Sequence, residues 1–213
     1  MSGLHKLKSG FIKFRKHYFE EHPELYEKLT IKGQSPGVLV IACCDSRVHP
    51  AQVLATEPGD IFVVRNVANL VPPFEDDGKS HGTSAAIEFA VKHLKVKHII
   101  VFGHAQCGGV RSLMEGEHDS HKYSFIDPWM STVRPAREKV LKQYSEADFD
   151  QQCRYCEEEV IRVSLKNLMS FPFIKEAVDS GSLTVGGWHF DITKGEINSL
   201  DEKTGQFVSI LGS

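Results

Sequence analysis

The stretch VLVIACCDSR at residues 38–47 decides the fold, and HIIVFGHAQCGG at residues 98–109 has the same pattern of residues. Each stretch begins with a short apolar run rich in β-branched residues and then changes to polar residues and glycine. Such runs are typical of strands that are buried on both faces of a parallel sheet. Because ligands of open α/β sheets bind beyond the carboxyl ends of the strands, the polar residues after the two runs predict a functional site there.

The two predicted strand ends carry metal-ligand chemistry. Cys43 follows the first run, and His104 and Cys107 follow the second. Thiolate sulfur and imidazole nitrogen are typical zinc ligands, and three protein ligands with one open position are typical of a catalytic zinc site. Cys107 also opens a predicted helix, whose positive end favours a thiolate. Either cysteine alone would more often be a small buried hydrophobe, but together with His104 they predict one Zn²⁺ per chain.

Asp45 and Arg47 lie close to the first ligand in the sequence. Residues 43, 45 and 47 alternate by two, so a continuing strand would put all three on one side and Cys44 on the other. Arg47 could then hold Asp45 ionised through a two-point hydrogen bond. Because Asp45 would already be engaged by Arg47, we expect water and not a fourth protein ligand at the open zinc position. Asp45 would then be a hydrogen-bond acceptor beside this water. The alternative is an ordinary structural ion pair.

The rest of the chain predicts an α/β fold with a mostly parallel central β-sheet flanked by helices and an antiparallel edge. Residues 4–30 are expected to be helical, with a break at Pro23 and an apolar stripe of Phe11, Phe14 and Tyr18. Further helices are expected at residues 49–55, 80–94, 128–144, 147–170 and 172–180, and from residue 107 onward. Further strands are expected at residues 61–66, 183–192 and 207–211, with a hairpin turn at 193–195.

Length and composition indicate the class of protein. With 213 residues and 41% hydrophobic content, the chain is expected to form one globular domain over residues 1–213. Residues 1–30 would be a helical arm and residues 31–213 the core. A net charge of −3 gives no reason to expect nucleic acid or an anionic membrane as a partner. The sequence also lacks a run of about 20 apolar residues, as a membrane span needs, and a signal-peptide pattern.

The five cysteines, an odd number, do not suggest a disulfide framework. Reduced thiols indicate a reducing compartment, so a cytoplasmic location is expected. Cys153 and Cys156 lie three residues apart in a predicted helix without a glycine or proline turn. This setting favours a structural pair over a redox motif or a second metal site.

The motif pair CxDSR and HxxCGG resembles the β-class carbonic anhydrases. Other segments carry the resemblance in the same order: GQSP at 33–36, EPGD at 57–60, VVRNVANLVPP at 63–73, AAIEFAV at 85–91 and the glycine pair at 186–187. The resemblance covers about residues 30 to 210. It implies reversible hydration of CO₂ to bicarbonate and a proton, with a zinc hydroxide nucleophile that the Asp45–Arg47 pair orients.

The resemblance implies roles for further residues around this centre. Gln34 matches a glutamine that, in plant-type members, donates a hydrogen bond to the substrate from across a dimer interface. Gly108 matches the backbone N–H that faces the substrate. The apolar wall of the CO₂ pocket is matched by Phe62, Val67 and Phe89, although plant-type members often carry tyrosine in place of Phe89. The alternatives are a turn residue for Gln34 and core packing for the three apolar side chains.

The resemblance also implies a subclass and an assembly. Members gated by a non-catalytic bicarbonate carry tryptophan three residues before the first ligand cysteine, where this chain has Val40. Together with Gln34, Val40 indicates the ungated, plant-like subclass. In the family the N-terminal arm wraps a neighbouring subunit, so a homo-oligomer built from dimers is expected, with packing of the arm on its own domain as the alternative. Two other functions stay open: CS₂ or COS hydrolysis on the same scaffold, and a non-catalytic zinc-binding protein.

Overall fold

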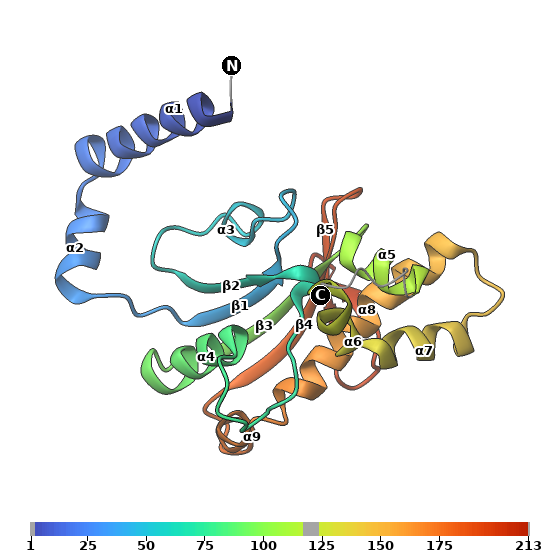
Figure 1. The fold of residues 1–213 in the computed structure, drawn as a ribbon. Helices are drawn as coiled ribbons and strands as arrows, with labels where there is room; N and C mark the ends of the chain where they lie inside the picture. The colour runs from blue at the N-terminus through green and yellow to red at the C-terminus, as the bar shows by residue number, and fades with distance from the viewer. Residues whose placement is uncertain (1–2, 117–123, 213) are drawn as a thin grey trace.

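A six-stranded sheet forms the centre of the computed structural model, which describes residues 3–116 and 124–212 (Figure 1). Its strands are β1 Val38–Cys43, β2 Ile61–Asn66, β3 His98–His104, β4 Thr184–Asp191, β5 Glu196–Leu200 and β6 Phe207–Ser209. They lie in the order β2-β1-β3-β4-β5-β6, and the first four run parallel. Because β5 and β6 pair antiparallel at one edge, the predicted α/β fold with its mostly parallel sheet is confirmed.

The helices agree with the predicted segments at most positions. Those among the described residues are α1 Gly3–Arg15, α2 Glu24–Lys32, α3 Pro50–Val53, α4 Gly82–Glu88, α5 Gly108–Glu115, α6 Ile126–Ser131, α7 Arg134–Gln143, α8 Phe149–Leu168 and α9 Pro172–Asp179. Residues Lys16–Glu21 and Phe89–His93 are π-helical, and Val67–Asn69 form a 3₁₀ turn. The helices α1 and α2 are separated at Pro23, as expected.

The structure differs from the predicted elements in three details. The single helix expected at residues 128–144 is two helices, α6 and α7, because Pro135 lies near the start of α7. A proline inside a continuous helix would remove one backbone hydrogen bond and clash with the preceding turn. The strand β5 was not predicted, since its sequence EINSL is largely polar, and β6 ends at Ser209 instead of Leu211.

The two faces of the sheet are covered unequally within one chain. Leu39 and Ile41 of β1 face a large apolar cluster that contains residues of α4, α8 and α9. Val40 and Ala42 point to the opposite face, where a smaller cluster includes Val53 and Leu54 at the end of α3. The long helix α8 lies so close to β4 that a Cβ atom at Gly187 would come within 2.5 Å of the Ile161 side chain. The same helix reaches the carboxyl end of the sheet, where Glu157 contacts the backbone of Cys107.

Parallel pairing brings four strand ends to one edge of the sheet. In the register of β1 with β3, Ala42 lies opposite Phe102, so Cys43 and His104 end neighbouring strands. Since β2 and β4 run in the same direction, their last residues, Asn66 and Asp191, flank this edge. The predicted functional site therefore has a physical location in the fold.

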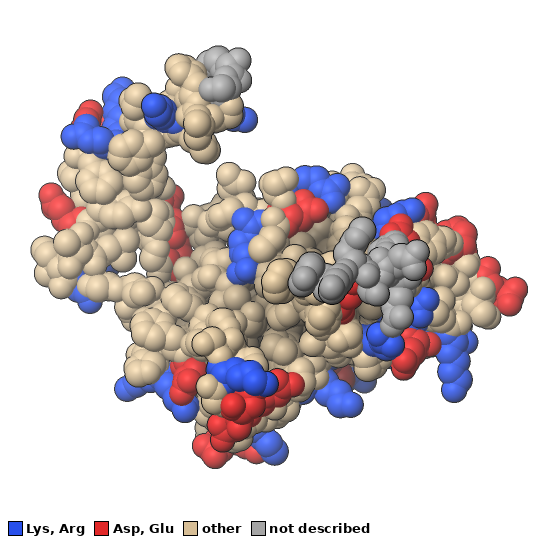
Figure 2. Space-filling model, viewed as in Figure 1, with Lys and Arg blue, Asp and Glu red and all other residues tan. Residues whose placement is uncertain are grey.

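The helices α1 and α2 of the N-terminal arm project from the body of the molecule (Figures 1 and 2). The first of these helices, α1, has no buried residue. Phe14 contacts the rings of Phe11 and Tyr18, which confirms that the three side chains of the predicted apolar stripe are neighbours. The middle of the arm contacts the rest of the chain through Tyr18, which lies between α1 and α2 and whose hydroxyl donates to Glu57 Oε2 over 2.7 Å.

Charged side chains of both signs are interspersed over the body on the face that Figure 2 shows. In the part of the chain that the structure describes, no helix is both long and apolar enough to cross a membrane.

Candidate metal centre

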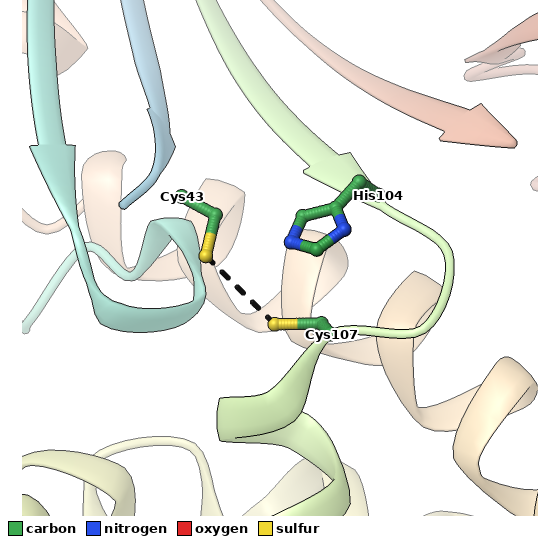
Figure 3. A group of neighbouring side chains, drawn as sticks. All are labelled: Cys43, His104 and Cys107. Carbon is green, nitrogen blue, oxygen red and sulfur yellow. Dashed lines mark hydrogen bonds between the residues drawn. The ribbon is translucent and has the colours of Figure 1, made fainter. Parts of the chain in front are cut away.

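Cys43, His104 and Cys107 converge at the carboxyl edge of the sheet (Figure 3). Cys43 is the last residue of β1, His104 is the last residue of β3, and Cys107 directly precedes α5. Their candidate ligand atoms all lie within 4.8 Å of one another, and the two sulfur atoms are 4.0 Å apart. All three side chains are buried. The structure thus brings together the three residues that the sequence predicts as ligands.

The imidazole of His104 is held in the form that a metal requires. Its Nδ1 lies 2.8 Å from the carbonyl oxygen of Ala105, which can only accept, so Nδ1 carries the proton. The other nitrogen, Nε2, then presents a lone pair, and it is buried without a hydrogen-bond partner. A backbone carbonyl that fixes the tautomer in this way is typical of metal-ligating histidines. An unpartnered nitrogen beside two sulfur atoms fits zinc, which prefers this donor set.

The two thiols influence each other strongly. Hydrogen bonding from the Cys107 thiol stabilises the Cys43 thiolate and lowers the pKa of Cys43 below its ordinary value, against the opposing effect of burial. The same hydrogen bond, together with burial, raises the pKa of Cys107. In the metal-free site one thiol therefore keeps its proton. A bound dication deprotonates a coordinating thiol, so zinc would bring both sulfur atoms into the thiolate form.

Asp45 and Arg47 form the expected pair, but not for the expected reason. The strand ends at Cys43, so residues 43, 45 and 47 do not continue a strand alternation. A tight turn joins them instead: the backbone N–H of Arg47 donates to Asp45 Oδ1 over 2.9 Å. The guanidinium then donates from Nε to Oδ1 over 3.0 Å and from Nη2 to Oδ2 over 2.7 Å. Cys44 is exposed and takes no part.

The guanidinium of Arg47 holds the pKa of the Asp45 carboxyl well below its usual range, because hydrogen bonds from Arg47 stabilise the carboxylate. Both carboxylate oxygens are engaged by one cation in a two-point geometry, the strongest form of such a pair. Asp45 is therefore ionised at neutral pH and held in one orientation close to Cys43, whose Sγ lies 3.4 Å from the backbone nitrogen of Asp45.

The structure adds supporting residues that the sequence interpretation missed. Arg65, on β2, donates to the carbonyl oxygens of Cys43 and Asp45 over 2.9 and 2.8 Å. As the one charged residue in the apolar strand IFVVRN, it was visible as an anomaly. Gln106 has a positive φ of 58°, a left-handed conformation that costs a non-glycine residue on the order of 1–3 kcal/mol. Glu157 of α8 contacts the Cys107 backbone, and nothing in its local sequence indicates this contact.

The residues predicted to contact substrate lie in different settings. The rings of Phe62 and Phe89 are 5.9 Å apart, and Phe89 is 43% exposed. Val67 lies against the start of α5, since a Cβ atom at Gly109 would come within 2.8 Å of it. A largely apolar cavity of about 510 Å³ also has Val67 on its wall. Gly108 is the first residue of α5 and faces open space.

Gln34 lies apart from the ligands within one chain. It is exposed and precedes β1, whereas Cys43 ends that strand. The six residues of β1 span roughly 17 Å at about 3.3 Å per residue, and Gln34 lies before the amino end of this strand, whereas the metal centre lies at its carboxyl end. The Gln34 side chain of the same chain therefore does not reach the metal centre.

A second group of potential ligands, Glu75, Asp77 and His81, lies on the surface. Asp77 already accepts hydrogen bonds from His81 and pairs with the ammonium of Lys79 at 2.9 Å. This cationic partner makes the group a poor match for a metal ion.

Comparison with known proteins identifies the class. Residues 38–197 match the family model of carbonic anhydrase, so the chain belongs to the carbonic anhydrase family, and its relatives place it in the β class. It is 39% identical to beta carbonic anhydrase 3 of Arabidopsis thaliana over 208 residues, which cover 96% of this chain and 80% of the relative. The function of this family is the hydration of CO₂, and the Cys43–His104–Cys107 cluster is typical of its zinc site.

Solved structures agree with this assignment. The β-carbonic anhydrase CcaA matches with a TM-score of 0.92 and 35% identity, covering 98% of this chain and 100% of that chain. Tetrameric β-carbonic anhydrases from the filamentous ascomycete Sordaria macrospora match with a TM-score of 0.81 and 33% identity, covering 92% and 96%.

Substitution of the first ligand tests the metal centre. Cys43→Ala removes one of three ligands, so we expect near-complete loss of bound zinc by elemental analysis of the purified protein. The matched control is Cys44→Ala, because Cys44 is the adjacent thiol but is exposed; it should keep about one zinc per chain. Full zinc content in Cys43→Ala would contradict the ligand assignment.

Proposed function

We propose that this chain hydrates CO₂ at an open zinc site of the ungated, plant-like type, with Cys43, His104 and Cys107 as the ligands. The observation that carries the proposal is the two-point pair between Asp45 and Arg47. Because both oxygens of Asp45 are engaged by Arg47, the carboxylate is not free to occupy the fourth zinc position. Val40 in place of tryptophan, and the presence of Gln34, support the same subclass.

When bound, zinc lowers the pKa of a water ligand and so supplies a nucleophile near neutral pH; carbonic anhydrases with three histidine ligands are the standard example of this effect. The protein's part is to aim this nucleophile. Asp45 would accept a hydrogen bond from the solvent ligand of the metal and so orient that ligand toward the carbon of CO₂. Arg47 keeps Asp45 ionised and fixed, so the acceptor needs no rearrangement as the reaction proceeds.

The substrate side of the site combines an apolar wall with two hydrogen-bond donors. Phe62, Val67 and Phe89 provide the wall against which CO₂, a molecule without a dipole, is held. Negative charge grows on a CO₂ oxygen as the molecule bends. The Gly108 N–H, which has no intrahelical partner at the first position of a helix, and Gln34 of the partner subunit donate to this oxygen. Donors that gain strength as charge develops accelerate the reaction.

We further propose a homo-oligomer built from dimers, in which residues 1–30 pack on a neighbouring subunit and residues 31–213 form the catalytic domain. The exposed arm and the position of Gln34 far from its own metal centre support this assembly, as do the tetrameric relatives from Sordaria macrospora. A cytoplasmic location is proposed as well, and all five cysteines being free thiols supports it.

The pH dependence of CO₂ hydration tests the proposed subclass. Since the pKa of Asp45 lies below its ordinary value, the carboxylate does not titrate from pH 8.5 down to about 6. Stopped-flow measurements should therefore show CO₂ hydration that persists well below neutral pH and falls gradually, without an abrupt cooperative collapse. Bicarbonate should inhibit as a product and not allosterically.

Three results would contradict parts of this proposal. A steep, cooperative loss of activity in acid would overturn the ungated subclass. Hydrolysis of CS₂ or COS in preference to CO₂, compared on the same preparation, would favour the alternative enzyme. Absence of any hydration by the zinc-loaded protein would favour a non-catalytic zinc protein.

Deletion of residues 1–22 tests the arm. Leu4, Leu7, Phe11 and Ile12 are 62–72% exposed, and burying each against a partner would contribute about 1.5–3 kcal/mol. The truncated chain should elute as a smaller species on size-exclusion chromatography, and CO₂ hydration should fall with it because Gln34 serves the neighbouring site.

A point substitution separates the apolar contact from the loss of the whole arm. Phe11→Glu should weaken the assembly, whereas Lys8→Glu, an exposed position on the same helix, should leave it intact. A truncated chain that is monomeric and fully active would show that the shared site is wrong, and a truncated chain that elutes as the full chain does would show that the arm does not hold the assembly together.

A further inference from the structure

The peptide group that joins Gln106 to Cys107 is held from both sides by opposite charges. Its carbonyl oxygen, on Gln106, accepts a hydrogen bond from Nη2 of Arg47 over 3.0 Å. Its N–H, on Cys107, donates to Oε1 of Glu157 over 3.2 Å. The cation thus faces the negative end of the peptide dipole and the anion faces the positive end. Rotation of this peptide by half a turn would reverse both contacts.

This peptide is also the one whose rotation would move a zinc ligand. Gln106 is in the left-handed region with φ 58°, a conformation that persists in non-glycine residues only when the surroundings enforce it. Cys107 follows immediately and presents its sulfur to the metal centre. The loop lines a cavity of about 500 Å³ together with Arg47 and Glu157, so close packing alone does not hold it in place.

Glu157 is itself held deep in the protein. It lies on α8 and is only 4% exposed, and a buried carboxylate requires partners. Its second oxygen, Oε2, lies 3.2 Å from Nε2 of His189, a fully buried residue of β4. The same nitrogen lies 3.2 Å from Nη1 of Arg154. A carboxylate oxygen can only accept and a guanidinium can only donate, so the tautomer of His189 decides which of the two contacts is a hydrogen bond, and support of Glu157 takes the tautomer with the proton on Nε2. Arg154 also pairs with Glu158 over 3.0 Å.

We propose that Glu157, supported by His189, is a positioning residue for the zinc ligand Cys107, acting with Arg47 as a clamp on the Gln106–Cys107 peptide. The inference rests on the proposed role of Cys107 as a ligand. Arg47 then has two tasks, since the same guanidinium orients Asp45 and holds the Gln106 carbonyl. Groups that orient a metal ligand without touching the metal typically change metal affinity about 10–100-fold when they are removed.

The test measures zinc affinity by competition with a chelator. Glu157→Met keeps the volume of the side chain but removes the acceptor, and we expect its affinity to fall about 10–100-fold. Glu157→Gln keeps an acceptor oxygen for the Cys107 N–H, so its affinity should be at least about tenfold higher than that of Glu157→Met. The matched control is Glu159→Met on the same helix, because Glu159 pairs with Lys139 and Arg162 instead; it should bind zinc as the wild type does.

A spectroscopic measurement separates positioning from general destabilisation. In the cobalt-substituted protein, sulfur-to-cobalt charge-transfer absorption reports thiolate ligation, and it should weaken in Glu157→Met but not in Glu159→Met. If Glu157→Met does not fold, His189→Phe takes its place: it leaves Glu157 present but unsupported, and it should lower zinc affinity by a smaller factor. Rescue by glutamine together with the altered spectrum would support the clamp.

Wild-type zinc affinity in Glu157→Met, or in His189→Phe where the first variant does not fold, would overturn the clamp. An equal loss in Glu159→Met would overturn it as well. Failure of the ligand assignment is distinguished by Cys107→Ala: if this variant binds zinc as tightly as the wild type, the proposed site and the clamp fall together.

Discussion

The parallel pairing of β1 with β3 is the constraint on which the metal centre depends. It places the ends of two strands, some sixty residues apart in the sequence, side by side at one edge of the sheet. Cys43 and His104 are the terminal residues of these strands, so their backbones are fixed by the hydrogen bonds of the sheet. Only Cys107 comes from a loop, and this is the ligand whose position needs further support.

Charged side chains around the centre act mainly on the backbone. Arg65 binds the carbonyl oxygens of Cys43 and Asp45, and Arg47 binds that of Gln106 as well as the Asp45 carboxylate. Glu157 accepts from the N–H of Cys107. These contacts satisfy backbone groups that neither a strand nor a helix would pair, which is the usual requirement where a buried loop changes direction. These hydrogen bonds therefore hold the loops around the metal centre in a conformation that would be strained without them.

Local patterns predicted the features that depend on a few neighbouring residues. The apolar runs before Cys43 and His104 have the signature of buried strands, and the ligand residues follow directly. The Asp45–Arg47 pair was correctly predicted although the strand alternation behind the prediction was wrong, because a tight turn also brings residues two apart together. The break between α6 and α7 was missed although Pro135 marks it in the sequence.

Contacts between distant elements could not be predicted in the same way. Glu157 lies 50 residues from Cys107, and its sequence reads as one more acidic position on a helix. Its role follows from the close approach of α8 to the sheet, which Gly103 and Gly187 permit beside Ile161. The left-handed conformation of Gln106 also has no local signal, since it is enforced by partners on other elements. Such features depend on the tertiary packing and not on the local sequence.

The most direct test of the open zinc site is a crystal structure of the zinc-loaded protein at neutral pH, with anomalous scattering recorded at the zinc edge. We expect one zinc about 2.3 Å from the sulfur atoms of Cys43 and Cys107 and about 2.0–2.1 Å from Nε2 of His104. The fourth position would hold a solvent molecule, with Asp45 still paired to Arg47. Zinc bound by an oxygen of Asp45, or no zinc between these three residues, would contradict the open zinc site.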